Sequence, residues 1–393
     1  MMSRKKFGFI YLFIYLFIYL FIYLFIYLFI SCSQNNDISE VKQVSVLRTS
    51  NVESYKWKDC DNLIVYTNNT SGFIVFDNYE ILDFHNCREK KMIKYNTKDN
   101  YQIYITYIPI KAFLVLTYDD CVASDYDAYQ IHRKYNVPGE LAINLKGYTL
   151  SKDRIKEMCL ESNWELVNHG YSHSCLQTVS LQRLHKADSN RIYGWFSASF
   201  QQGVEVLLGD DIYLVKGHGS DNEGTYFECE PNLVKDYDKG TKLKLSDNQL
   251  EIELFFDVDN FTSETSIPIN NFTYPYTVYD DRTIELLSTR YNSARSYNDM
   301  DNKNSTDPGM NYFPFANRYK LNSASFTNYY EYDEIENVLR KAKETNALMI
   351  QYTHSWDKNF SLDKLDYLIQ EANKLNITIA TRQKIWEYYE LFN

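Results

Sequence analysis

The chain has 393 residues with a formal net charge of −11, and 45% of them are hydrophobic while 24% are charged. This length and composition are typical of a folded globular protein with one large domain or two smaller ones. The acidic balance, with short basic runs only at 3–6 (SRKK) and 87–91 (CREKK), argues against a nucleic-acid partner.

The N-terminal segment is apolar and repetitive. Residues 7–30 carry no charge, and residues 11–30 are five consecutive copies of YLFI. The perfect repeat is of low complexity and carries no information about the fold. An uncharged run of this length predicts an export signal or a membrane anchor.

The residues after this run, FISCSQNND, resemble the lipobox of bacterial lipoproteins, although Phe29 stands where leucine is usual. Cys32 would then become the lipidated first residue of the mature protein. An uncleaved transmembrane anchor is the alternative. Both interpretations make 1–32 a signal or anchor segment and 33–45 a polar tether, with the remainder membrane-anchored in the cell envelope and facing away from the cytoplasm.

The remaining cysteines do not define a disulfide framework. Six of them allow 15 pairings, and their spacing selects none. Because no CxxC motif is present, a zinc site built on thiolates is not expected.

Two structural patterns follow the tether. Residues 46–110 contain short apolar runs such as NLIVYT and YQIYITY, separated by polar turns such as NNTSG, which predicts a small β module. Residues 111–393 instead alternate strand and helix patterns, beginning with the buried strand AFLVLTY at 112–118 and a helix near 125–135. This alternation predicts an α/β domain with a parallel sheet or barrel and helices outside it.

The α/β pattern is interrupted at about 201–268, which we interpret as a β-rich insertion. Within it, TKLKLSDNQLEIELFF alternates like a hairpin around SDNQ. Strand and helix patterns resume at NNFTYPY (270–276) and continue to the terminal helix RQKIWEYYELF (382–392).

Two adjacent carboxylates, Asp119 and Asp120, follow the first buried strand of this domain. Such neighbours repel each other at the edge of low-dielectric protein, and a cation would make the arrangement tolerable. Adjacent acids also cap helices or lie in solvated loops, which is the simpler alternative.

A histidine pair ends a later strand. WELVNHGYSHS places His169 at the strand end and His173 four residues later. Two neutral imidazoles and one carboxylate make a facial set of metal ligands that leaves positions for water and substrate. The alternative is two surface or core histidines. His85, His132, His185 and His218 have no partner at ligand spacing and are expected to be structural or exposed.

Together these motifs resemble the polysaccharide deacetylase family, the NodB-homology domain of the carbohydrate esterases. The family motif T-[FY]-D-D matches residues 117–120, H-[ST]-x-x-H matches 169–173, and F-R-P-P-Y matches FTYPY at 272–276. A histidine ending a late strand matches His354 in MIQYTHSW. The resemblance covers roughly 112–200 and 269–390, and it implies a distorted (β/α) barrel of the NodB-homology type.

The resemblance also implies roles. Asp119 would be the general base, Asp120, His169 and His173 would bind a divalent metal, for which zinc is expected, and His354 would be the general acid. The backbone N–H of Tyr276 would donate to the oxyanion. Side chains expected to contact substrate are Tyr118, Tyr274 and Trp356, although a core role for Trp356 is equally compatible with the sequence.

Two departures from the family motifs affect this reading. Thr273 stands where the family has an arginine, and Arg295 in NSARS is a candidate replacement, the alternative being a structural ion pair. Gly170 replaces a hydroxyl residue, which should loosen the loop.

Two functions therefore compete. The first is metal-dependent hydrolysis of acetyl groups, most simply N-acetyl groups, from an envelope or extracellular polysaccharide. The second is a catalytically impaired protein of the same fold that binds carbohydrate.

Overall fold

The computed structural model describes residues 46–50, 52, 54–57, 62–67, 72–76, 81–84, 90–94, 102–297, 309–328 and 331–389. The predicted signal or anchor segment and the tether lie outside these residues. Among the described helices, none is both long enough and apolar enough to cross a membrane. The chain divides into two compact units, residues 1–107 and 108–393.

The described residues of the first unit are mainly strands, in keeping with their short apolar runs. They form a sheet of order β1-β4-β5 and a sheet of order β2-β3-β7-β6. The strands are β1 (Val46–Ser50), β2 (Ser54–Trp57), β3 (Asn62–Thr67), β4 (Gly72–Phe76), β5 (Ile81–Phe84), β6 (Lys90–Lys94) and β7 (Gln102–Pro109).

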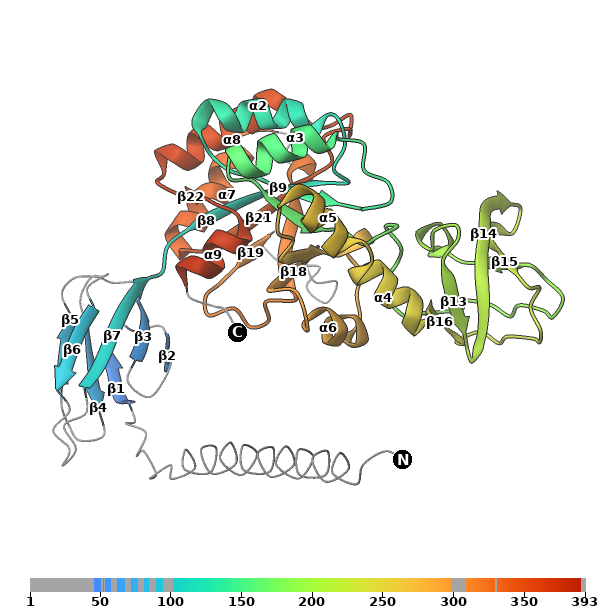
Figure 1. Cartoon of the computed structure of the whole chain (residues 1–393), viewed down its shortest axis with the longest axis horizontal. Helices are drawn as coiled ribbons and strands as arrows, with labels where there is room; N and C mark the ends of the chain where they lie inside the picture. Colours follow the sequence, from blue (N-terminus) through green and yellow to red (C-terminus); the bar gives the residue numbers. More distant parts are fainter. Residues whose placement is uncertain are drawn as a thin grey trace, which may run out of the picture. The chain divides into compact units, whose positions relative to one another are not determined.

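The second unit is built on a closed parallel barrel (Figure 1). Each strand pairs with the next in parallel, and the last pairs with the first to close the ring. In order they are β8 (Phe113–Asp119), β9 (Glu140–Ile143), β10 (Glu165–Asn168), β17 (Asn271–Thr273), β18 (Ser293–Tyr297), β20 (Leu321–Ser325) and β21 (Leu348–Thr353). This arrangement confirms the predicted (β/α) barrel.

Two short strands extend the barrel sheet. β22 (Thr378–Ile379) pairs with the beginning of β8 in parallel, and β19 (Met310–Asn311) pairs with β21 antiparallel. The first half of β8 thus pairs with β22 and its second half with β9, which distorts the ring.

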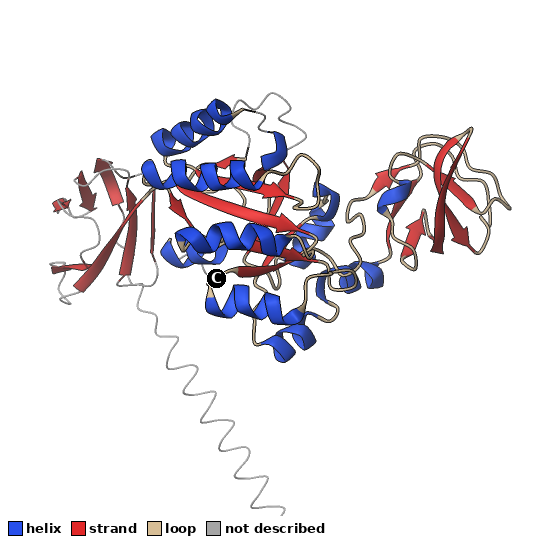
Figure 2. Ribbon diagram, turned by 90° about the horizontal axis from the view of Figure 1, so that it is seen from above, coloured by secondary structure: helices blue, strands red, loops and turns tan. Residues whose placement is uncertain are grey.

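Helices surround the strands, as Figure 2 shows. Several begin at a side-chain cap, and the predicted cap Ser151 accepts a hydrogen bond from the backbone N–H of Arg154. The helices also bury one face, for which α7 is an example with Ile335, Leu339 and Ala342 buried. They are α2 (Asp125–Tyr135), α3 (Lys152–Lys156) with a π-helical turn at Glu157–Glu161, α6 (Asp281–Leu287), α7 (Tyr332–Thr345), α8 (Leu362–Lys374) and α9 (Arg382–Tyr388).

Between β10 and β17 lies an antiparallel six-stranded sheet of order β11-β16-β13-β14-β15-β12. We call residues 179–245, which contain this sheet, the inserted sheet. It begins earlier in the chain than the β-rich insertion expected at about 201–268. Its strands are β11 (Val179–Ser180), β12 (Arg191–Tyr193), β13 (Glu205–Leu208), β14 (Asp211–Asp221), β15 (Gly224–Glu230) and β16 (Lys242–Leu245).

The hairpin predicted around SDNQ is wrong. β16 ends at Leu245, and α4 (Asp247–Phe255) follows it, then α5 (Val258–Thr265). The Ser246 hydroxyl accepts a hydrogen bond from the backbone N–H of Gln249 at 3.2 Å and so caps α4. Leu250 and Leu254, four residues apart, are buried on one face of the helix, and this tertiary burial overrides the local alternation.

Candidate active site

The carboxyl ends of the barrel strands bring most of the predicted site residues together. Asp119 ends β8 and Asp120 follows it, His169 follows β10, and His354 follows β21. Arg295 lies within β18, and Tyr276 lies in a short 3-10 helix (Pro275–Thr277) after β17. Because all these strands are parallel, their carboxyl ends share one rim of the barrel, where the loops of such folds build functional sites.

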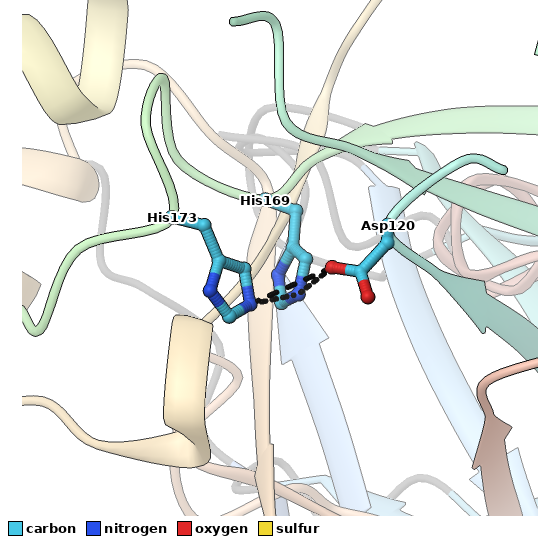
Figure 3. Close-up of side chains that lie close together, drawn as sticks. All are labelled: Asp120, His169 and His173. Atoms are coloured by element: carbon cyan, nitrogen blue, oxygen red, sulfur yellow. Dashed lines mark hydrogen bonds and ion pairs between the residues drawn. The ribbon is translucent and has the colours of Figure 1, made fainter. Parts of the chain in front are cut away.

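Asp120, His169 and His173 form a cluster of possible metal ligands, and Figure 3 shows their side chains pointing toward one another. The two imidazole Nε2 atoms are 3.1 Å apart. Oδ1 of Asp120 lies 3.7 Å from Nε2 of His173 and 4.0 Å from Nε2 of His169. One ligand atom from each residue therefore falls within 4.8 Å of the others.

A second contact fixes which ring nitrogen of His169 faces the cluster. Nδ1 of His169 lies 2.9 Å from the carbonyl oxygen of Thr273, and because a carbonyl only accepts, Nδ1 carries the proton. Nε2 is then a lone-pair donor directed at the cluster. Burial lowers the pKa of His169 well below its ordinary value and also lowers the pKa of His173, so both imidazoles stay neutral.

This donor set fits a divalent metal. Two imidazole nitrogens bound to one tetrahedral zinc ion lie roughly 3.3 Å apart, given bonds of about 2.0 Å, which is close to the separation of the two Nε2 atoms. Asp120, His169 and His173 are thus the residues of the described chain suited to hold the ion.

Asp119 lies beside the cluster and forms a buried ion pair. Nη2 of Arg295 donates to Oδ1 of Asp119, and the Arg295 side chain is completely buried. The guanidinium also lies 4.9 Å from the ring centre of Tyr352. Arg295, the candidate replacement for the missing motif arginine, thus contacts Asp119, the predicted general base. Thr273, at the motif position itself, contacts Nη2 of Arg382 at 3.3 Å.

His354 lies next to Asp120. Its Nε2 lies 3.8 Å from Oδ2 of Asp120. Nε1 of Trp356 donates to the same oxygen at 3.2 Å, and the Trp356 side chain remains 60% exposed beside it. Trp356 therefore lies at the site, with its ring available to a substrate.

A buried carboxyl joins the loop after β21 to the loop after β8. Oδ1 of Asp125 accepts from the hydroxyl of Ser355 at 2.5 Å, and Oδ2 accepts from the backbone N–H of Val122 at 2.8 Å. Burial raises the pKa of Asp125 to about 7. These hydrogen bonds link the loop that carries His354 to the loop that follows Asp120.

Tyr276 flanks the histidines. Its ring centre lies 4.6 Å from that of His173, and its hydroxyl accepts from Nε2 of Gln201 at 2.8 Å. Tyr276, His173 and Asp120 all have positive φ, at 53°, 62° and 76°. Left-handed backbone at large non-glycine residues is costly and tends to occur at functional sites, which here is the rim of the barrel.

Tyr118 and Tyr274, predicted to contact substrate, require correction because both are core residues. Each is 1% exposed. The hydroxyl of Tyr118 bonds Nε2 of His132 at 2.8 Å, while the hydroxyl of Tyr274 donates to the carbonyl oxygen of Tyr319 at 3.0 Å. Neighbouring strand residues point to opposite sides, so Tyr118 faces away from the site that Asp119 enters.

Sequence reasoning missed Glu253, a buried residue of α4. Its carboxylate accepts hydrogen bonds from the backbone N–H of Ser172, at 2.9 Å, and from the Ser172 hydroxyl. Ser172 lies between the two histidines, so Glu253 holds the His169–His173 loop. The tight turn at Gly170 has a φ of 78°, and an added Cβ would lie 3.1 Å from Pro275. Glycine is the residue that this left-handed backbone and the nearby Pro275 favour.

The other described histidines and cysteines lie outside the cluster. His132 and His185 are buried, and Nε2 of His218 contacts the carbonyl oxygen of Phe200 at 2.7 Å. Cys121, Cys159, Cys175 and Cys229 are free thiols. His85, Cys60 and Cys87 lie outside the described residues.

No protein-family model matches the chain, and no curated protein matches it. Solved structures do align with it at low identity. An acetyl xylan esterase of family 4 from Clostridium thermocellum, in complex with a cobalt ion, is 11% identical over 70% of this chain and 90% of its own, with a TM-score of 0.36. A variant of the peptidoglycan deacetylase PdaC from Bacillus subtilis is 11% identical over 71% and 92%, with a TM-score of 0.36.

A third aligned structure is a pseudoenzyme of carbohydrate esterase family 4 from Bacillus anthracis, 10% identical over 87% of this chain and 89% of its own, with a TM-score of 0.39. The solved structures to which this chain is similar are therefore polysaccharide deacetylases and related proteins of carbohydrate esterase family 4, the family that the sequence motifs resemble.

Proposed function

We propose that the chain is a metal-dependent deacetylase that hydrolyses acetyl groups, most simply N-acetyl groups, on an envelope or extracellular polysaccharide. The observation that carries the proposal is the convergence of Asp120, His169 and His173 beside the Asp119–Arg295 pair and His354 on one rim of the barrel. A divalent ion held there, with zinc as the expected one, supplies Lewis-acid polarisation of the acetyl carbonyl and of water.

The residues of the chain then have distinct tasks. Asp119 takes the proton from the attacking water, while Arg295 balances its charge and fixes its orientation. The backbone N–H of Tyr276 donates to the oxyanion that the carbonyl oxygen becomes when water adds to the acetyl carbon. His354 gives a proton to the amine nitrogen as the C–N bond breaks, so that acetate and a free amine leave. The exposed ring of Trp356 lines the entrance for a sugar unit.

The alternative, an impaired enzyme that only binds carbohydrate, rests on the departures at Thr273 and Gly170. Two contacts favour the enzyme instead. Arg295 supplies a guanidinium to Asp119 although Thr273 does not, and Glu253 holds the loop in which Gly170 lies. Arg295 and Glu253, which make up for the departures at Thr273 and Gly170, are both distant from them in the sequence.

An acetate-release assay with the full-length protein in mild detergent tests this proposal. The substrates are peptidoglycan, a β-linked N-acetylglucosamine polymer and acetylated xylan, each with added divalent metal. Asp119→Asn should keep the metal and lose turnover by about 10²- to 10⁴-fold, the usual worth of a general base. Asp120→Asn should bind metal more weakly and recover partly in excess ion. Metal binding without acetate release from any of the polymers would favour the carbohydrate-binding alternative.

The proposed location is the cell envelope, with the N-terminal segment as membrane anchor. This part of the proposal rests on the apolar run and on Cys32 in the sequence.

A further inference from the structure

The inserted sheet carries a pocket of about 240 Å³ at the end of β12. Three separate segments line it, which approach one another only in the folded chain. The lining residues are Gln182, Arg183, Tyr193, Gly194, Trp195, Glu223, Gly224 and Thr225. None of them belongs to the candidate active site.

The dominant feature of the pocket is an exposed indole. Trp195 is 61% exposed, whereas its neighbour Phe196 is completely buried. A Cβ on Gly194 would come within 2.4 Å of the Phe196 ring, so the glycine allows the close turn that buries Phe196 and leaves Trp195 outside. The backbone N–H of Gly194 donates to the carbonyl oxygen of Thr225, and the Thr225 hydroxyl donates to the carbonyl oxygen of Gly194, each at 3.1 Å. These two hydrogen bonds hold the backbone of the turn that carries Trp195 against β15.

The charges of the pocket cancel. Nη2 of Arg183 lies 3.1 Å from Oε2 of Glu223, and the Arg183 guanidinium stacks 3.9 Å from the ring centre of Tyr193. The other lining residues are uncharged, and they include the exposed amide of Gln182 and the hydroxyl of Thr225. A flat aromatic face beside planar hydrogen-bonding groups of zero net charge suits a ligand that is neutral, with apolar C–H faces and many hydroxyls.

A peptide adding to the sheet edge is disfavoured. β12 is an edge strand, but the backbone N–H of Tyr193 donates to Nε2 of His185 at 2.9 Å. Ser189 likewise accepts from the backbone N–H of Arg191 at 3.1 Å. Because these backbone N–H groups are already hydrogen-bonded, they are not free to pair with an added peptide strand.

The inserted sheet is also tied to the candidate active site. Its first strand begins six residues after His173, and its last strand leads directly into α4, which carries Glu253. The backbone N–H of Gln201 donates to the hydroxyl of Ser174 at 3.0 Å, while its side chain donates to Tyr276. A ligand held on the inserted sheet is thus held on a segment that is joined to the His169–His173 loop and hydrogen-bonded to residues beside it.

We infer that the inserted sheet is a carbohydrate-binding site that holds a neutral stretch of the polysaccharide on the Trp195 face. The inference extends the proposed function, because the captured polymer would be the one whose acetyl groups the barrel removes. Its binding step needs no turnover, so it can be tested separately.

Sedimentation with insoluble chitin, xylan and peptidoglycan tests the site, using full-length protein in mild detergent. All proteins carry Asp119→Asn, so that binding is measured without hydrolysis. Trp195→Ala should weaken binding about fivefold to tenfold on the polymer that the parent binds, since loss of one aromatic contact costs about 1 to 1.4 kcal/mol. Val234→Ala is the matched control, because Val234 is in the same inserted sheet and is also 61% exposed.

Binding that is equal in the parent and Trp195→Ala, or absent with all three polymers, would overturn the inference. If binding depends on Trp195 but the protein with Asp119 intact releases no acetate, the carbohydrate site is supported and the proposed activity is refuted. If the protein with Asp119 intact releases acetate but binding does not depend on Trp195, the proposed activity is supported and the carbohydrate site is refuted.

Discussion

Arg295 and Asp119 are joined by a buried hydrogen-bonded ion pair, although they are 176 positions apart in the chain. The Arg295 side chain has no exposed surface, and its Nε and Nη1 atoms have no hydrogen-bond partner among the described residues. Burying a guanidinium with most of its N–H donors unpaired costs folding free energy. We therefore infer that Arg295 is retained for its interaction with the Asp119 carboxylate.

Replacing this arginine should therefore be severe. Arg295→Gln leaves the Asp119 carboxylate buried without its cation, and we expect a loss of about 3 to 5 kcal/mol in the free energy of unfolding. Acetate release by the remaining folded protein should fall as well. Urea unfolding and turnover assays measure the two effects. Arg290→Gln is the control, because its ion pair with Asp259 is largely exposed and should contribute about 1 kcal/mol or less. Equal losses in both variants would contradict the role given to Arg295.

Metal content should depend on the histidine pair. His169→Ala and His173→Ala each remove one of three protein ligands, and we expect metal affinity to fall by at least about tenfold in both. Elemental analysis after dialysis against a fixed free-metal concentration gives the readout. His218→Ala, which removes a histidine of the inserted sheet, should leave the metal content unchanged. A full complement of metal in all three variants would show that the ion binds elsewhere.

Glu253 should act on the metal through the loop it holds. In Glu253→Gln the amide puts an N–H₂ group where Ser172 needs an acceptor, so the His173 loop should loosen. We expect metal affinity to fall about 10-fold or more, as for other outer-shell partners of ligands. Titration with a metal-sensitive dye measures the affinity. Glu251→Gln lies on the exposed face of the same helix and serves as the control. Unchanged affinity in Glu253→Gln would leave the carboxylate with only a packing role.

His132 should make stability depend on pH. It is completely buried, its Nδ1 lies 3.0 Å from the carbonyl oxygen of Pro138, and burial lowers its pKa from 6.5 to about 4. Between these two values the His132 of the unfolded chain binds a proton that the His132 of the folded chain does not. The contribution of His132 to stability is therefore full above pH 6.5 and is lost as the pH drops toward 4. The loss amounts to about 3 kcal/mol.

Urea unfolding at a series of pH values between 4 and 7 measures this effect. In His132→Gln the part of the slope of unfolding free energy against pH that His132 contributes should vanish. The variant should also be less stable at pH 7, because it loses the hydrogen bonds to Tyr118 and Pro138. A slope identical to that of the wild type would mean that other groups carry the pH dependence.

Cys32 distinguishes the two predicted anchors. If the lipobox interpretation is correct, Cys32→Ala should abolish incorporation of labelled fatty acid, because the thiol is the attachment point. Fractionation of labelled cells measures both lipid content and membrane association. Membrane association without lipid label in the wild type would instead identify the apolar run as a transmembrane anchor.

The sequence by itself predicted an α/β domain with parallel strands, and the resemblance of its motifs to a known family implied the barrel and the metal cluster. Apolar runs alternating with amphipathic helices favour parallel strands, and polar residues directly after those runs, such as Asp120 and His169, are then expected at the same edge of the sheet. These patterns are local in the sequence. Residues that follow different strands become neighbours because parallel strands end at the same edge of the sheet.

Only the tertiary structure decided the contacts that complete the site. Which arginine reaches Asp119 depends on the closure of the ring, which no local pattern records. The helix that carries Glu253 forms because Leu250 and Leu254 are buried, although the alternation of the segment favours a strand. Tyr118 and Tyr274 lie in the core because their strands present other side chains to the rim. In each case burial against residues distant in the chain outweighs the local preference, since packing contributes more free energy than intrinsic propensity.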